Sequence, residues 1–142
     1  MAETKQSGAV RCVIVTPEAT VLDTQARFVA LPLFDGQRGI GHGHAAFIGR
    51  LGAGEVRISG EPGTGDASRS TFVEGGFVEV GHDTVTVITQ RAIPAEKLDV
   101  AAARAELEQA TAAKASGDEA IAARLRAQEA ARAVVRTATR GR

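Results

Sequence analysis

The sequence predicts an N-terminal antiparallel β-sandwich, or flattened barrel, of about ten short strands, followed by a C-terminal antiparallel α-helical hairpin. The composition changes abruptly at Pro94, because all four prolines lie at or before this residue and only two of the 16 glycines follow it. The 48 residues after Pro94 contain 17 alanines. Alanine favours helix, whereas proline and glycine interrupt it. We therefore expect a flexible N-terminus over residues 1–8, a sandwich over 9–94 and a helical hairpin over 95–142.

Short runs rich in Val, Ile, Thr and Phe alternate with turn residues before Pro94. The run from 20 to 31 is the longest, and it is expected to end at Pro32 because proline cannot donate to a strand ladder. The pair Gly75-Gly76 permits a bulge or a tight turn between two strands. The strands predicted from these runs cover residues 10–15, 20–31, 56–59, 70–73, 77–80 and 84–89.

From about Leu98 the apolar residues recur at the three- and four-residue steps of a helix. Gly117 is expected to end a first helix and Asp118 to cap a second one. Two helices joined by so short a link fold back antiparallel. Their facing surfaces are mostly alanine, which buries little apolar area, so we expect stable helices with a weak mutual contact. The larger or recurring apolar positions are Val100, Ala103, Leu107, Ala110, Ile121, Leu125, Val134 and Val135.

Net charge and cysteine content exclude several classes of protein. The chain carries 17 basic and 17 acidic residues, so its charge does not favour nucleic-acid binding. The single cysteine, Cys12, excludes an internal disulfide and is typical of a reducing compartment. No segment approaches the roughly 18 consecutive apolar residues that a membrane span needs. We expect a soluble protein that can still bind to a membrane complex.

The sequence offers few residues for catalysis or metal binding. His42 and His44 would share one face of a strand, yet no carboxylate completes a recognisable ligand spacing, so no metal site is predicted. The segment from Gly39 to Gly43 lacks the sixth-position glycine of a dinucleotide fingerprint and the Gly-Lys-Ser/Thr ending of a phosphate-binding loop. Cys12 lies within a predicted strand and is expected in the core. We therefore predict no catalytic residue and expect that this chain is not an enzyme.

A row of polar residues recurs every four positions along the predicted second helix. Such a row is either a solvated face or an electrostatic contact for acidic side chains of a partner. Residues 118–142 carry six arginines against three acidic residues, whereas residues 1–90 have an excess of three acidic residues. The C-terminal segment is therefore the candidate contact for an acidic partner. The row consists of Arg124, Gln128, Arg132, Arg136 and Arg140.

The segment 35–45 resembles the G-x-x-G-I-x-x-G-H-A signature of the ε subunit of bacterial and chloroplast F-type ATP synthases. Segment 54–58 is similar to the Gly-x-Val-Arg-Ile strand that follows in this family, and 71–80 to its strand–Gly-Gly–strand segment. The likeness runs from about residue 9 to 139, and four such motifs in order are specific to the family. His42 departs from it, since the family usually has proline at that position. The matching signature residues are Gly36, Gly39, Ile40, Gly43, His44 and Ala45.

The resemblance implies a non-catalytic subunit of the central stalk, or rotor, that helps to couple proton flow to ATP synthesis at the cytoplasmic face of the bacterial inner membrane. In this family the sandwich binds the γ subunit and rests on the ring of membrane c subunits. The helical hairpin either folds against the sandwich or extends along γ towards the β and α subunits, where it opposes ATP hydrolysis. The resemblance implies γ or c-ring contacts at Asp35, Gly36, Gln37, Arg38 and His44, and an inhibitory basic row of Arg124, Arg132, Arg136 and Arg140.

Some members of the family bind ATP on the hairpin through an Ile/Leu-Asp-x-x-Arg-Ala motif and two arginines of the second helix. Asp99, Arg132 and Arg136 match parts of this site, but Ala102 stands at the arginine position of the motif. The resemblance therefore predicts no cofactor, with ATP as a regulatory ligand only if the site works without that arginine. Two other interpretations stay open: a free-standing sandwich that dimerises through its helices, and a small metal- or nucleotide-binding sensor.

Overall fold

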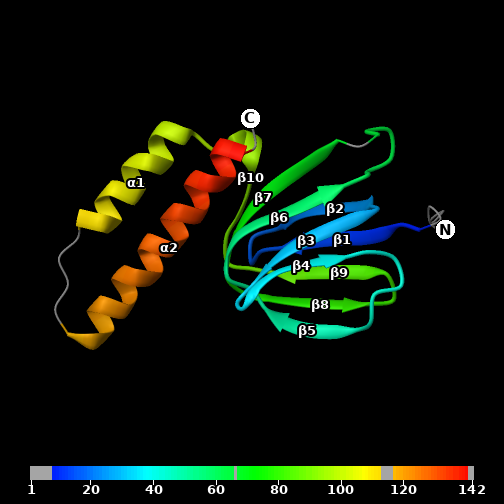
Figure 1. The fold of residues 1–142 in the computed structure, drawn as a ribbon, viewed down its shortest axis with the longest axis horizontal. Coiled ribbons are helices and arrows are strands. Elements are labelled where there is room, and N and C mark those ends of the chain that lie inside the picture. The colour runs from blue at the N-terminus through cyan, green and yellow to red at the C-terminus, as the bar shows by residue number, and fades with distance from the viewer. Residues whose placement is uncertain (1–7, 66, 113–116, 141–142) are drawn as a thin grey trace.

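The computed structural model describes residues 8–65, 67–112 and 117–140, and it shows two five-stranded sheets followed by a helical hairpin (Figure 1). The predicted fold class is confirmed. The predicted flexible N-terminus, apart from Gly8, lies outside the described residues. The strands are β1 Val10–Val15, β2 Thr20–Ala26, β3 Phe28–Leu33, β4 Gly36–Ile40, β5 Phe47–Arg50, β6 Ala53–Ser59, β7 Ser68–Glu74, β8 Phe77–Gly81, β9 Thr84–Ile88 and β10 Ala92–Pro94. A short 3₁₀ turn, η1, covers Ala95–Lys97, and the helices are α1 Val100–Ala112 and α2 Asp118–Arg140.

The strands are ordered β2-β1-β9-β8-β5 in the first sheet and β10-β7-β6-β3-β4 in the second. Within the described residues, every strand pair in these sheets is antiparallel except β1 with β9, which is parallel. The sequence suggested a wholly antiparallel sandwich, whereas the structure contains this one parallel pair among the described strands. Strands joined by short turns pair antiparallel, whereas a parallel pair needs a long connection. Here that connection is nearly the whole sandwich, because β1 is its first strand and β9 its last but one.

The single long strand predicted over residues 20–31 is in fact two strands, β2 and β3, that belong to different sheets. The chain turns from one sheet to the other at Arg27. The backbone N–H of Arg27 donates a hydrogen bond of 2.9 Å to the carbonyl oxygen of Ser59 at this corner. Residues on both sides of the corner favour strands, so hydrophobic pattern alone did not reveal the break.

The strand β3 also continues through Pro32, where the sequence suggested that it ends. Leu33 pairs with Gly36 across a two-residue turn, so Pro32 falls in a pair that exchanges no backbone hydrogen bond with β4. The ladder between β3 and β6 reaches only Ala30. The missing N–H of the proline therefore removes no bond from either ladder.

The glycine-rich parts of the sandwich contain strands and crossings that the pattern did not predict. The strands β4 and β5 lie in the glycine-dense segment, and Gly75-Gly76 carries the chain from the second sheet to the first instead of closing a tight turn. Gly76 has a φ of 103°, and a Cβ atom there would collide with the carbonyl oxygen of Ile88. This position requires glycine because both the backbone angle and the close approach exclude a side chain.

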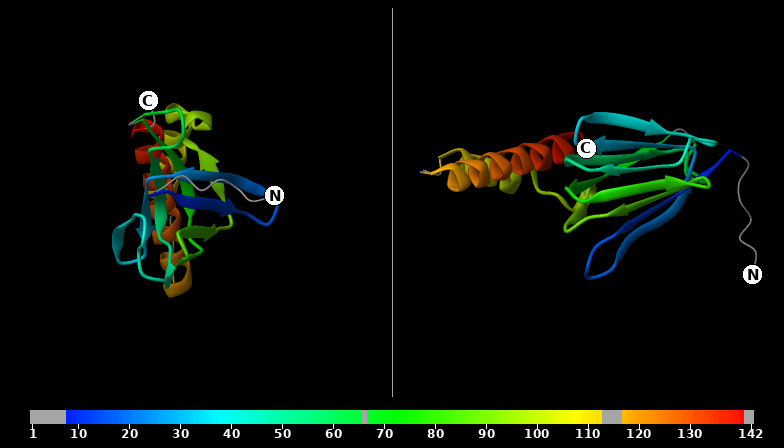
Figure 2. Two further views of the ribbon diagram at one scale, coloured as in Figure 1. Left: turned by 90° about the vertical axis from the view of Figure 1, so that its right-hand side faces the viewer. Right: turned by 90° about the horizontal axis from the view of Figure 1, so that it is seen from below.

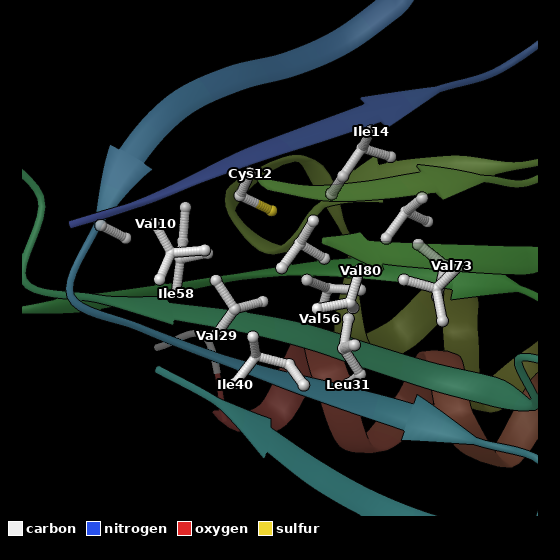
Figure 3. Close-up of a cluster of buried hydrophobic side chains, with 14 of the residues drawn as sticks. Val10, Cys12, Ile14, Val29, Leu31, Ile40, Val56, Ile58, Val73 and Val80 are labelled. Atoms are coloured by element: carbon white, nitrogen blue, oxygen red, sulfur yellow. The ribbon is translucent and has the colours of Figure 1, made fainter. Parts of the chain in front are cut away.

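An apolar core fills the space between the two sheets (Figure 3). Its side chains come from alternate positions of the strands, as in β1, where Val10, Cys12 and Ile14 are buried and the residues between them are partly exposed. This alternation is the period expected of a strand with one face towards the core. The predicted core position of Cys12 is confirmed. The core consists of Val10, Cys12, Ile14, Ala26, Val29, Leu31, Ile40, Leu51, Val56, Ile58, Val73, Val78, Val80, Val85 and Val87.

The helical hairpin lies on one side of the sandwich, with the C-terminal half of α2 nearest to it (Figures 1 and 2). This part of α2 packs on β6, β7 and the 3₁₀ turn through a second apolar cluster. We call it the docking cluster; its buried members are Phe72, Leu98, Ala103, Ala133, Val134 and Ala138, and Ala53, Ile93, Val100 and Val135 pack against it.

The two helices contact each other through smaller residues than the sequence pattern suggested. Ile121 and Leu125, which were assigned to the apolar period, are 44% and 59% exposed. Ala103 is the buried apolar residue of α1. Polar side chains of α2 bond to α1 across the seam, and Ile121 and Leu125, the larger apolar residues of the first half of α2, remain on its surface.

Candidate functional site

Four of the residues predicted to contact a partner, Asp35 to Arg38, lie on the hairpin of β3 and β4, whereas His44 lies beyond β4, at the other end of the sandwich. Phe34 and Asp35 form its two-residue turn, and the N–H of Phe34 donates 2.8 Å to the carbonyl oxygen of Arg50 on the other sheet. Gly36 follows with a φ of 135°, a value that favours glycine. The side chains from Asp35 to Arg38 are exposed, because β4 is the edge strand of its sheet.

The loop that carries His44 is held in place by one carboxylate. Asp83 accepts a hydrogen bond of 2.7 Å from the backbone N–H of Gly43, and its second oxygen lies 2.9 Å from Nδ1 of His42. Asp83 itself lies in a two-residue turn with a φ of 55°. The departure from the family proline at position 42 therefore gives this loop a side-chain contact that proline could not make.

Two of the predicted contact residues meet on one aromatic ring. The guanidinium carbon of Arg38 lies 5.0 Å from the centre of the Phe47 ring, and the ring of His44 lies 5.4 Å from the same ring. Phe47 is on β5, the edge strand of the other sheet. The structure thus brings Arg38 and His44 together across the two sheet edges, although they are six positions apart in the chain.

The metal pair considered from the sequence has no support in the geometry. Nδ1 of His44 lies 2.7 Å from the carbonyl oxygen of Ala45, and His42 faces Asp83. Nowhere in residues 8–65, 67–112 and 117–140 do three His, Cys, Asp or Glu side chains gather as a metal site would require.

The basic row of α2 does not form one continuous face. A step of four residues exceeds one helical turn by about 40°, so the row winds around the helix. Arg124 and Gln128 face α1: Nη2 of Arg124 donates 3.2 Å to the carbonyl oxygen of Thr111, and Nε2 of the buried Gln128 donates 3.4 Å to that of Ala110. Arg132 and Arg136 are exposed, and the side chain of Arg140 lies outside the described part of the chain.

Asp99 has a structural role at the start of α1. Its Oδ1 atom accepts hydrogen bonds from the backbone N–H groups of Ala101 at 2.8 Å and Ala102 at 3.3 Å. These contacts make Asp99 the N-cap of the helix. The carboxylate considered as part of an ATP site is therefore engaged by its own helix, and the absence of a cofactor, with ATP at Asp99, Arg132 and Arg136 only as a conditional ligand, stays a prediction.

Two clefts border the docked helix α2. The smaller, of about 250 Å³, contains residues of the β3–β4 hairpin, of β6 and of α2; it is lined by Pro32, Leu33, Gly36, Gln37, Ala53, Gly54, Glu55, Ala133, Arg136 and Thr137. The larger, of about 440 Å³, is lined by Phe34, Arg50, Leu51, Gly52, Ala53, Glu74, Gly75, Arg126, Ala127, Glu129 and Ala130. Both clefts lie between α2 and the end of the sandwich that carries the β3–β4 turn, and the smaller one contains Gly36 and Gln37 of the predicted contact.

The comparisons with known proteins agree with this architecture. The family model of the "ATP synthase, Delta/Epsilon chain, beta-sandwich domain" matches residues 9–95. An "ATP synthase epsilon chain" of Rhodopirellula baltica is 48% identical over 102 residues, which cover 72% of this chain and 77% of that protein. The chain belongs to the ATP synthase ε-chain family. The expectation that it is an accessory subunit of ATP synthase, and not itself the catalyst, is confirmed by this membership.

Solved structures extend the likeness of this ε-family chain beyond the sandwich. A chain of the Euglena gracilis mitochondrial ATP synthase, solved as OSCP, F1 and c-ring in rotational state 1, matches with a TM-score of 0.73 at 21% identity. The match covers 94% of this chain and 81% of the other. A chain of the Tetrahymena thermophila mitochondrial ATP synthase central stalk and c-ring matches with a TM-score of 0.65 at 14% identity, over 91% and 96% of the two chains. Such coverage includes the helices, so the fold likeness extends to the hairpin.

In this ε-family chain the sandwich side of the docking cluster is the surface that the hydrophobic pattern did not reveal. Phe72 and Val73 are adjacent on β7, and both are 0% exposed. Neighbouring strand residues point to opposite faces, so two buried large side chains in succession mean that both faces of the sheet are covered. That succession was visible in the sequence and could have indicated a helix on the outer face of the second sheet.

Neither α1 nor α2, the two α-helices in the described part of the chain, combines the length and the apolar character that a membrane span requires.

Proposed function

We propose that this chain is the ε subunit of the central stalk of an F-type ATP synthase, where its sandwich binds the γ subunit and rests on the c-ring. Family membership and the central-stalk and c-ring assemblies that contain chains of the same fold support this role. The subunit thereby helps to couple proton flow to ATP synthesis. Its place is peripheral, at the cytoplasmic face of the bacterial inner membrane. The contact residues are Asp35, Gly36, Gln37, Arg38 and His44.

The hairpin acts as a mobile inhibitor of ATP hydrolysis in this proposal. The observation that carries it is the size of the docking cluster, to which the described part of the hairpin contributes Leu98 and Val134 and otherwise only alanines as buried apolar residues. Burying one Val or Leu side chain contributes about 1.5–3 kcal/mol. A two-state equilibrium needs about 5.5 kcal/mol to move from 1:99 to 99:1. A cluster of this size can therefore hold the hairpin down and still be released by a partner.

The released hairpin presents its arginines to acidic segments of the β and α subunits. Arg132 and Arg136 are already exposed in the docked state, so their use by a partner breaks no hydrogen bond that the structure shows for them. Arg124 bonds to α1, so its use requires the two helices to separate. The proposal thus ranks Arg132 and Arg136 before Arg124 as early contacts.

The test is an ATP hydrolysis assay on the assembled synthase, with the full chain or with a chain that lacks residues 118–142. We expect faster hydrolysis without α2. The double variant Arg132→Ala with Arg136→Ala is compared with Arg104→Ala, an exposed arginine of α1 that loses the same kind of charge. Unchanged hydrolysis in the truncated complex would refute the inhibitory role. Recovery of the chain as a lone dimer that does not bind γ would refute the stalk role and favour a free-standing binding module.

A further inference from the structure

We infer that the docked helix α2 is part of the surface that meets the c-ring, so that ring binding holds the hairpin in its docked, non-inhibitory position. This inference rests on the proposed function. Arg136 then belongs to the ring contact. Binding of the chain to the ring is thereby coupled to the position of its hairpin.

The smaller cleft carries the inference. The exposed residues Gly36 and Gln37 of the predicted ring contact line this cleft together with Arg136, which is exposed on α2. About one turn before Arg136, α2 contributes Ala133 to the docking cluster, and the next residue, Val134, belongs to it as well. Arg136 therefore stays beside the β3–β4 hairpin only as long as the cluster holds α2 against the sandwich.

The floor of the cleft shows why the helix and the β3–β4 hairpin come so close. Gly54 is buried on β6, and a Cβ atom at this position would lie 2.6 Å from Cβ of Pro32 on β3. The absence of that atom lets the proline ring approach β6, and Pro32 lines the cleft together with Ala133 and Thr137 of α2. Thr137 is buried, and its hydroxyl donates a hydrogen bond of 2.8 Å to the carbonyl oxygen of Ala133. The hydroxyl therefore needs no hydrogen-bond acceptor in the cleft. Gln37 and Arg136 are the exposed long side chains of this cleft, whose volume of about 250 Å³ leaves room for a partner group.

The chemistry of the rim indicates the part of the ring that fits. Arg136 and the amide of Gln37 offer hydrogen-bond donors on exposed side chains, and the buried Glu55 is the acidic residue that lines the same cleft. Donors of this kind bind carboxylates and carbonyl oxygens. We assign the surface to the polar loops of the c-ring, which would place acceptor groups at the rim of the cleft.

Ring binding and docking of the hairpin are thermodynamically linked in this inference. If Arg136 contributes to ring affinity only in the docked state, ring binding must favour the docked state by the same factor. An exposed charge at an interface rim changes affinity by about fivefold. A chain that is pulled away from the ring would accordingly release its hairpin more readily.

The experiment measures the affinity of the full chain for a purified γ–c-ring assembly in nanodiscs. Arg136→Ala is compared with Arg132→Ala, which removes the same charge one turn earlier on α2 and does not line the cleft. We expect Arg136→Ala to weaken binding by about fivefold and Arg132→Ala to leave it within about twofold. Equal affinities of the two variants would overturn the inference while the proposed function stands. A wild-type chain that does not bind the assembly would overturn the proposed function itself.

A second comparison tests the dependence on docking. Val134→Asp places a carboxylate in the docking cluster and should detach α2, whereas Ala123→Asp adds the same charge at an exposed position of the same helix. Arg136→Ala should weaken ring binding in the Ala123→Asp background and have no effect in the Val134→Asp background, with detachment checked by hydrogen exchange of α2. An equal loss in both backgrounds would show that Arg136 acts independently of docking. Phe72→Ala, which truncates the other side of the cluster, serves as a second detached background.

Discussion

At the scale of single residues, burial decides the chemistry of the one thiol. Cys12 is 0% exposed in the core, and burial raises the pKa of its thiol from 9.0 to about 12. The thiolate is the reactive form of cysteine. Cys12 is therefore a structural residue, and the sequence-based preference for a core residue over a nucleophile agrees with its environment.

The raised pKa predicts a loss of stability at alkaline pH. The unfolded chain deprotonates its thiol above pH 9.0, while the folded chain keeps it neutral up to about pH 12, so the neutral thiol stabilises the fold fully below pH 9.0 and this contribution disappears across that window. At pH 10 the loss is about 1.4 kcal/mol. Urea unfolding at pH 7 and pH 10 checks this, with Cys12→Ala expected to lose less on the same change of pH. Equal losses in the two proteins would contradict the assignment.

Two neighbouring glycines give a second prediction at this scale. Gly75→Ala meets open space at a φ of 71° and should cost about 1 kcal/mol in the free energy of unfolding. Gly76→Ala has a φ of 103° and collides with the backbone of Ile88, so it should cost more than about 3 kcal/mol. Chemical denaturation measures both. Similar costs would mean that the crossing between the sheets adapts to a side chain.

At the scale of elements, the periodic spacing of apolar residues predicted the strands and helices that have one apolar and one polar face. It worked for β1 and for β9, which alternate clearly, and for the two helices, whose alanines favour helix whatever they contact. It did not find β4, because Gly36 and Gly39 carry no side chain to alternate. It also joined β2 to β3, since a corner between two sheets leaves the local pattern unchanged.

The contact residues could be predicted from family resemblance, but their arrangement in space could not be predicted from their spacing. The positions from Asp35 to His44 came from family resemblance, and spacing alone would not have placed Arg38 and His44 on the ring of Phe47. The polar row of α2 was visible, but its division was not. Four-residue steps suggest a single face, but each step exceeds one turn of the helix. Gln128 therefore points inward, whereas Arg132 is exposed.

The N-cap of α1 provides the prediction at this scale. Asp99→Ala removes the acceptor of two backbone N–H groups and should lower the free energy of unfolding of the hairpin by about 1 kcal/mol. Asp99→Asn retains the cap. Circular dichroism at 222 nm during thermal unfolding distinguishes the variants. A loss of the same size in Asp99→Asn would mean that the charge of Asp99, and not its capping oxygen, stabilises the helix.

At the scale of the whole molecule, one strand separates two kinds of stability. Val73 faces the core between the sheets and Phe72 faces the docked hairpin, although they are adjacent on β7. The sandwich and the docking of the hairpin can therefore be weakened independently. This arrangement suits a subunit that must keep one part fixed while the other moves.

This separation can be tested by hydrogen exchange on two variants. Phe72→Ala should increase exchange in α2 and leave β1 protected, because it removes the largest side chain of the docking cluster. Val73→Ala should lower the protection of β1 and of the other core strands, at a cost of about 1–3 kcal/mol to the sandwich. Exchange that rises throughout the chain in both variants would show that the two parts unfold as one unit.

The parallel pairing of β1 with β9 also has a consequence for synthesis of the chain. Arg11 pairs with Thr84, so the first strand has no neighbour on that side until the ribosome has made and released nearly the whole sandwich. Contacts between such distant segments form slowly, whereas helices form within about a microsecond. The alanine-rich helices need only local contacts, and they dock on the second sheet, whereas the slow pairing of β1 with β9 closes the first. The two sheets therefore differ in what limits their formation: the first waits for two distant segments to meet, whereas the second offers its docking face to helices that form locally.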